Sequence, residues 1–244
     1  MEASRLHAGH WRGRALLHRD THPESWQTQL SWYAGAAVLG FAVPYLGSSV
    51  LDLQHDFYLG LYFTAVLGLL WAYARATRLD VRAALVRNWK PGVALGLVFG
   101  FVLVRNVYSD AATPHPNGAY YWFELVWRGG LYGAVDALLL TVLPCLVAYR
   151  SLGGRLESWK KRFAYFGAAL ALVLTMTAVY HLGYDQYRQD GVKAPETGNT
   201  IISMPMLLTA NPIGSVADHM AMHISAVAHT YETDVRLPPP TTAR

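Results

Sequence analysis

Long apolar stretches alternate along this chain with short stretches that hold most of its charged residues. The apolar stretches run over residues 30–51, 57–74, 91–104, 120–149, 163–184 and 200–230. An α-helix needs about 20 apolar residues to cross the hydrocarbon core of a bilayer, and most of these stretches approach or exceed that length. The pattern predicts an all-α fold, a polytopic transmembrane helix bundle of about six or seven spans.

The last apolar stretch is interrupted at Asn211 and Pro212. The break predicts a short apolar segment over 201–210 and then a helix over 213–229, with Asn211 as its N-cap and Pro212 at its first position. If the break separates two crossings, the C-terminus lies outside the cytoplasm. If it is only a kink, the C-terminus lies inside, and the sequence allows both arrangements.

Arginine and lysine gather in alternate connecting segments, and the segments between them are short or mixed in charge. The basic residues are Arg5, Arg12, Arg14 and Arg19, then Arg75, Arg78, Arg82, Arg87 and Lys90, then Arg150, Arg155, Lys160, Lys161 and Arg162. Because cytoplasmic loops are enriched in lysine and arginine, the N-terminus is predicted to be cytoplasmic. The chain divides into a polar, basic N-terminal segment (1–28), a transmembrane helical domain (29–231) and a flexible, Pro-rich tail (232–244).

The composition supports a membrane protein and excludes two other classes. Hydrophobic residues make up 53% of the chain and charged residues 15%, whereas soluble domains carry about 25% charged residues. The net charge of +4 does not indicate nucleic-acid binding, because the basic residues lie where a membrane protein places them. Cys145 is the single cysteine, which rules out a disulfide framework within one chain.

The fourth apolar stretch contains three ionisable residues, and an ionisable group inside a span is by default a functional hypothesis. Glu124 and Arg128 lie four residues apart, so they share a helix face and can form an ion pair. Arg128 could instead bind an oxyanion or orient the carboxylate. Asp136 lies about 80° around an α-helix from Arg128, in mid-span, and is expected to pair with a histidine from another span.

Three histidines in the last two apolar stretches are further candidates. His181 ends the fifth stretch, where an interfacial position is the simpler interpretation and a catalytic one the alternative. His219 and His223 have the i, i+4 spacing with which two histidines bind zinc from one helix face. Met220 stands where the zinc metalloprotease motif has glutamate, so His219 and His223 are retained as a candidate zinc site without that motif.

Three segments, in order, are similar to motifs of the CAAX protease and bacteriocin-processing family of membrane proteins. They are residues 123–129, 180–183 and 214–223. The family motifs are a Glu-Glu pair followed after three residues by arginine and usually glycine, an aromatic residue followed by histidine, and a histidine with asparagine or aspartate four residues later. The resemblance covers about half of the chain.

The best-known members of that family are intramembrane endopeptidases in which a glutamate and histidines activate water. The resemblance implies that Glu124, Arg128, His181 and His223 are the catalytic residues. It also implies a bacterial inner (plasma) membrane location. The partners expected are the lipid bilayer and either another membrane protein or a membrane-embedded peptide, with no nucleic acid.

The chain departs from the family pattern at two positions. Phe123 replaces the first glutamate of the pair, and Val227 replaces the asparagine or aspartate of the third motif. Two hypotheses therefore lead, ahead of a transporter or a metal-binding redox protein, which ranks last. The protein is an intramembrane peptidase-like hydrolase, or it is a catalytically inactive member that serves as an accessory or scaffold subunit of a membrane protein complex.

Overall fold

The structure is a computed structural model that describes residues 25–233 and 236–237. The described residues are 81% helical and form no strand, which confirms the predicted all-α bundle. Most of the predicted N-terminal segment (1–28) and most of the predicted tail (232–244) lie outside the described residues. The first helix begins at Trp26, within the segment that was predicted to be polar.

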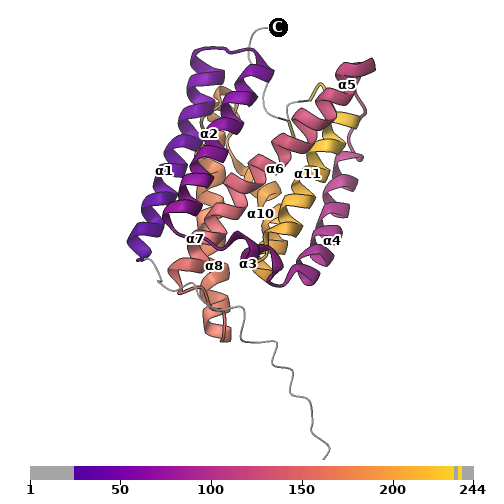
Figure 1. The fold of residues 1–244 in the computed structure, drawn as a ribbon. Coiled ribbons are helices and arrows are strands. Elements are labelled where there is room, and N and C mark those ends of the chain that lie inside the picture. Colours follow the sequence, from indigo (N-terminus) through magenta and orange to yellow (C-terminus); the bar gives the residue numbers. More distant parts are fainter. Residues whose placement is uncertain (1–24, 234–235, 238–244) are drawn as a thin grey trace, which may run out of the picture.

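The long helices follow the predicted apolar stretches (Figure 1). They are α1 (Trp26–Pro44) with the π-helical turn η1 (Tyr45–Val50), α2 (His55–Ala76), α4 (Trp89–Val107), the continuous rod α5 (Gly118–Glu124), η2 (Leu125–Leu131), α6 (Tyr132–Ala137), η3 (Leu138–Val142) and α7 (Leu143–Ser151), and then α8 (Trp159–His181), α10 (Lys193–Thr209) and α11 (Pro212–His229). The short helices α3 (Val81–Val86) and α9 (Asp185–Asp190) lie in connecting segments. Five of the described rods are long and apolar enough to cross a membrane: residues 26–50, 55–76, 89–107, 118–151 and 159–181.

The break at residues 211 and 212 separates two helices that run in opposite directions. The Asn211 side chain accepts a hydrogen bond from the backbone N–H of Ile213, as predicted for an N-cap, and donates to the carbonyl oxygens of three residues around α3. The other end of α11 lies beside the far end of α4, where the His229 ring contacts the backbone carbonyl of Asp110. The helix before the break begins at Lys193, earlier than the predicted apolar segment 201–210.

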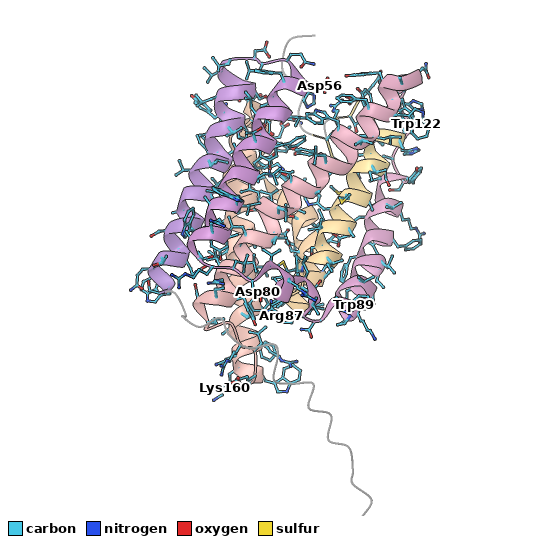
Figure 2. All side chains as sticks on the ribbon, viewed as in Figure 1. Asp56, Asp80, Arg87, Trp89, Trp122 and Lys160 are labelled. Atoms are coloured by element: carbon cyan, nitrogen blue, oxygen red, sulfur yellow. The ribbon has the colours of Figure 1, made fainter. Side chains whose placement is uncertain are left out.

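The connecting loops lie at two opposite ends of the bundle (Figure 2). Asp56 and Trp122 lie at one end, while Asp80, Arg87 and Lys160 lie at the other. The second end, called the basic end below, carries the loops around α3 and between α7 and α8, which hold the predicted clusters of arginine and lysine. The alternation of basic and mixed loops in the sequence therefore corresponds to two opposite ends of one bundle.

The rod of residues 118–151 forms the centre of the bundle. Of its most apolar window, 83% is buried inside the protein, compared with about a third for each of the other four rods. This burial places its ionisable residues inside protein and away from lipid, as expected for charged groups in a span.

A stripe of glycines brings α11 close to α4. Gly92, Gly96 and Gly100 lie on the buried face of α4, and a Cβ atom added at Gly96 would lie 2.5 Å from the Cα atom of Gly214 on α11. Small residues at such positions let two helix backbones approach closely in a membrane, where lipid supplies no hydrophobic drive for association. The stripe thereby holds α11, with His219 and His223, in contact with the core.

Candidate functional site

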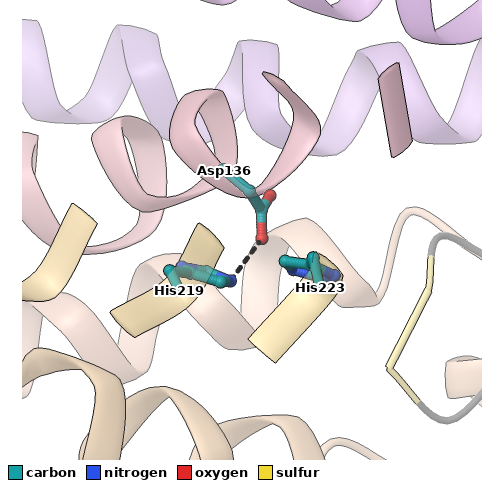
Figure 3. Close-up of side chains that lie close together, drawn as sticks. All are labelled: Asp136, His219 and His223. Carbon is teal, nitrogen blue, oxygen red and sulfur yellow. Dashed lines mark ion pairs between the residues drawn. The ribbon is translucent and has the colours of Figure 1, made fainter. Parts of the chain in front are cut away.

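Asp136, His219 and His223 form a buried cluster where the central rod meets α11. The carboxylate Oδ2 of Asp136 lies 3.4 Å from Nε2 of His219 (Figure 3). One ligand-type atom from each of the three residues lies within 4.8 Å of the others. The two imidazole rings stack with their centroids 4.8 Å apart, as their i, i+4 spacing on one helix allows. Asp136 thus pairs with a histidine of another apolar helix, as the sequence predicted.

Neighbouring groups fix the orientation of this cluster. The Tyr62 hydroxyl of α2 donates a 2.8 Å hydrogen bond to Oδ1 of Asp136, so the two carboxylate oxygens have different partners. The ring of Tyr132 meets His223 edge-on at 4.8 Å between centroids. A Cβ atom at Gly133 would lie 2.9 Å from the Cα atom of Met220, so glycine permits the close contact between α6 and α11 that the cluster needs.

Several nitrogen atoms of the cluster are buried without hydrogen-bond partners. They are Nδ1 of His219 and both ring nitrogens of His223. His223 is only 4% exposed, and the backbone of Arg236 faces its ring without making a well-formed hydrogen bond. A buried polar atom left unpaired costs about 1–3 kcal/mol, so these nitrogens are available to a further group.

The cluster lies on the wall of a cavity of about 610 Å³. His181 lines the same cavity, as do residues of α4, α10 and the C-terminal segment. The walls are mainly apolar and aromatic and also carry polar side chains such as Asp136, Lys193 and Asn199, which is typical of a small-molecule or substrate site. Arg236 and Leu237 close one side, where Arg236 pairs with Asp110 and Leu237 is 3% exposed.

His181 has a fixed tautomer. Its Nδ1 atom lies 2.8 Å from the carbonyl oxygen of Thr177, one turn earlier in α8. A carbonyl oxygen can only accept a hydrogen bond, so Nδ1 carries the proton and Nε2 keeps its lone pair. A histidine held in this way can accept a proton at Nε2 or bind a metal through it.

A chain of hydrogen-bonded tyrosines supports the cavity wall. The hydroxyl oxygens of Tyr58 and Tyr184 are 2.6 Å apart, those of Tyr184 and Tyr180 are 2.9 Å apart, and those of Tyr180 and Tyr132 are 2.9 Å apart. All four are at least 96% buried and come from α2, α6, α8 and the segment after α8. The chain links three parts of the bundle and ends at the ring that contacts His223.

Glu124 and Arg128 form a separate ion pair in the central rod, one of the two roles predicted for them. Arg128 donates a 3.1 Å hydrogen bond to Glu124, and the pair does not line the cavity. Tyr231 covers it, because its hydroxyl donates to the same carboxylate oxygen at 3.2 Å and its ring lies 5.0 Å from the guanidinium. Burial raises the pKa of the Tyr231 phenol, which therefore stays protonated as the donor.

Of the residues that the resemblance implies, the structure brings His181 and His223 to one cavity and places Glu124 and Arg128 outside its lining. The zinc candidates His219 and His223 lie together, with Asp136 as a third member. Tyr62 and Tyr132 also belong to the site, and the sequence analysis missed them. Their signal was available, since a phenol in the middle of an apolar span needs a hydrogen-bond partner.

In comparisons with known proteins, the chain matches no family model, no curated protein and no solved structure. The function of the site is therefore inferred from its geometry.

Proposed function

We propose that this protein is a membrane-embedded hydrolase that cleaves an amide bond in a membrane-inserted peptide. The observation that carries the proposal is the convergence of His181, His223 and the Asp136–His219 pair on one cavity inside an apolar bundle. The resemblance to the CAAX protease and bacteriocin-processing family points in the same direction. Its second and third motifs supply two of the cavity histidines.

The proposed reaction begins with water in the cavity. Nε2 of His181 accepts a proton from the water, and the water oxygen attacks the amide carbon to form a tetrahedral oxyanion. Hydrogen-bond donors on the cavity wall stabilise that oxyanion in a site of low dielectric. His181 then returns its proton to the leaving nitrogen, the carbon–nitrogen bond breaks, and a carboxylic acid and an amine are released.

The surroundings of the cavity favour a substrate that is largely apolar. Side chains such as Leu103, Ile202 and Met222 line it beside the tyrosines. A peptide segment that enters from the membrane would exchange lipid contacts for these walls at little cost, while its amide reaches the polar cluster.

The test is hydrolysis of quenched fluorescent peptides anchored in liposomes that contain the purified protein. A library of membrane-tethered sequences is used because the cleavage sequence is not known. We expect His181→Gln to lower the rate by about 10²–10⁴-fold, the usual contribution of a general base. His115→Gln, at an exposed loop histidine, is the matched control and should cleave at the wild-type rate. Equal rates for wild type and His181→Gln would refute the mechanism.

A second candidate is a non-catalytic accessory or scaffold subunit of a membrane complex. The observation that favours it is the Glu124–Arg128 pair, in which the two charged residues of the first motif neutralise each other away from the cavity. The replacements at Phe123 and Val227 agree with this role. It predicts that wild type and His181→Gln both leave the whole peptide library intact and co-purify the same membrane partner.

We further propose that the basic end of the bundle faces the cytoplasm, with the N-terminus on that side of a plasma membrane. The support is the excess of arginine and lysine at that end. In a Cys145→Ser background, a cysteine introduced at Ser158 should react with an impermeant thiol reagent only after the membrane is opened, whereas one at Ser109 should react in intact cells. The reverse labelling pattern would show that the basic end faces away from the cytoplasm.

A further inference from the structure

We infer that Asp136, His219 and His223 form a site for one zinc ion. Each residue can offer one ligand atom, and the three atoms already lie within 4.8 Å of one another. Ligands of a single zinc ion lie somewhat closer together, because zinc binds each nitrogen or oxygen at about 2.0–2.2 Å. A small rotation of buried side chains therefore completes the site without movement of the helices.

The unpartnered nitrogens of the two histidines are the second observation. If the cluster were only a structural ion pair, the Asp136–His219 contact would suffice and His223 would have no reason to be polar. Instead, both ring nitrogens of His223 are buried and unpaired beside that contact. A metal ion bound through one nitrogen of His223 removes the cost at that atom, since a ligating nitrogen needs no hydrogen bond.

Support around the cluster resembles the outer shell of a metal site. Tyr62 donates to Oδ1 of Asp136 and leaves Oδ2 directed at His219, so the carboxylate has one oxygen for a metal and one for its support. Ligating carboxylates in proteins are commonly hydrogen-bonded in this way, which orients them and raises their affinity. The edge-on contact from Tyr132 fixes the plane of the His223 ring.

The donor set selects among metals. Two imidazoles and one carboxylate suit zinc and similar transition metals, whereas calcium and magnesium prefer oxygen ligands alone. Three protein ligands leave one position of a tetrahedral ion open, and all three ligands line the cavity. His181, with its free Nε2, lines the same cavity and can hold a water molecule at the open position or act as a fourth ligand.

Zinc binding is tested with protein that has been purified in detergent, treated with a chelator and then freed of the chelator. Titration calorimetry with Zn²⁺ should show one equivalent bound per chain, and binding should raise the temperature of thermal unfolding. His223→Gln and Asp136→Asn should each lower the affinity more than about 100-fold, the largest loss expected from removing only a supporting hydrogen bond. His115→Gln should bind zinc as the wild type does, and Mg²⁺ and Ca²⁺ should not bind.

Several outcomes would overturn the site. They are wild-type protein that takes up no zinc, zinc affinity that is unchanged in His223→Gln, or equal affinity for Ca²⁺. If Asp136→Asn does not fold, the wild-type stoichiometry and His223→Gln still decide the question, because His223 has no hydrogen bond to lose. The zinc titration needs no substrate, so failure of the peptidase assay would not refute the zinc site. Failure of the titration would in turn leave the proposed hydrolysis standing, because His181 acts there as a general base without a metal.

Discussion

Replacement of Gly96 by alanine tests the packing that holds the site together. The added Cβ atom would lie 2.5 Å from the Cα atom and 2.8 Å from the carbonyl oxygen of Gly214. Carbon atoms in good contact are about 3.5–4.0 Å apart, so α4 and α11 must separate locally by about 1 Å. Both clashing atoms belong to backbone, so no side chain can rotate away. We expect Gly96→Ala to lower the free energy of unfolding by about 1–3 kcal/mol.

Gly167 of α8 is the matched control. It is exposed and helical, and a Cβ atom there would meet no other atom within 4 Å. Alanine at this position should be neutral or stabilise the helix by up to about 1 kcal/mol, because alanine has the higher helix propensity. The two glycine-to-alanine changes are chemically identical, so the difference between them reports only the contact of α4 with α11.

The assay is reversible unfolding in mixed micelles, followed by far-ultraviolet circular dichroism. The reasoning is refuted if Gly96→Ala and Gly167→Ala unfold with free energies that agree within about 0.5 kcal/mol, the usual effect of a neutral surface substitution. That result would mean that α11 does not approach α4 as closely as described. The geometry of the histidines on α11 would then need revision as well.

Three further changes follow from buried polar contacts. Arg128→Met should cost about 3–5 kcal/mol by leaving Glu124 charged and unpaired, and the double variant with Glu124→Gln should recover most of that loss in a double-mutant cycle of unfolding free energies. Tyr62→Phe should lower zinc affinity by about 10–100-fold, measured by calorimetry, because Asp136 loses its supporting hydrogen bond. Asn211→Ala should lower the midpoint of unfolding in the same micelle assay, with a cost of at least about 1–2 kcal/mol, because a helix cap and three bonds to buried carbonyls disappear together.

The spans could be predicted from the sequence because each rests on a local property. Long apolar runs with few charged residues marked the five long rods, and the Asn-Pro pair marked the start of α11. The start of α10 was missed because Lys193 and Glu196 lie in its first turn. Hydropathy alone places the beginning of the segment after these charged residues. Whether the Asn-Pro break is a kink or a reversal depends on the carbonyl groups around α3 that bind Asn211, and these are remote in sequence.

The site could be predicted only in part. The histidines of α8 and α11 were found by residue type and spacing, and Asp136 was expected to have a histidine partner. The identity of that partner depends on how helices pack. The estimate of about 80° between Arg128 and Asp136 assumed an uninterrupted α-helix, whereas residues 125–131 form a π-helical segment with more residues per turn. The angle of about 80° between Arg128 and Asp136 therefore does not hold on this rod, although the i, i+4 contact of Glu124 with Arg128 does.

The two polar clusters of the central rod differ in whether their buried polar atoms have partners. In the first, Glu124 and Arg128 contact each other, and Tyr231 covers them, so the pair lies apart from the cavity. In the second, Asp136 contacts His219 while His223 stays unpaired on the cavity wall. Burial of polar groups is costly in both places, and in the first the ion pair offsets that cost directly. The second retains an uncompensated cost beside open space, which argues that a substrate, a water molecule or a metal ion completes it.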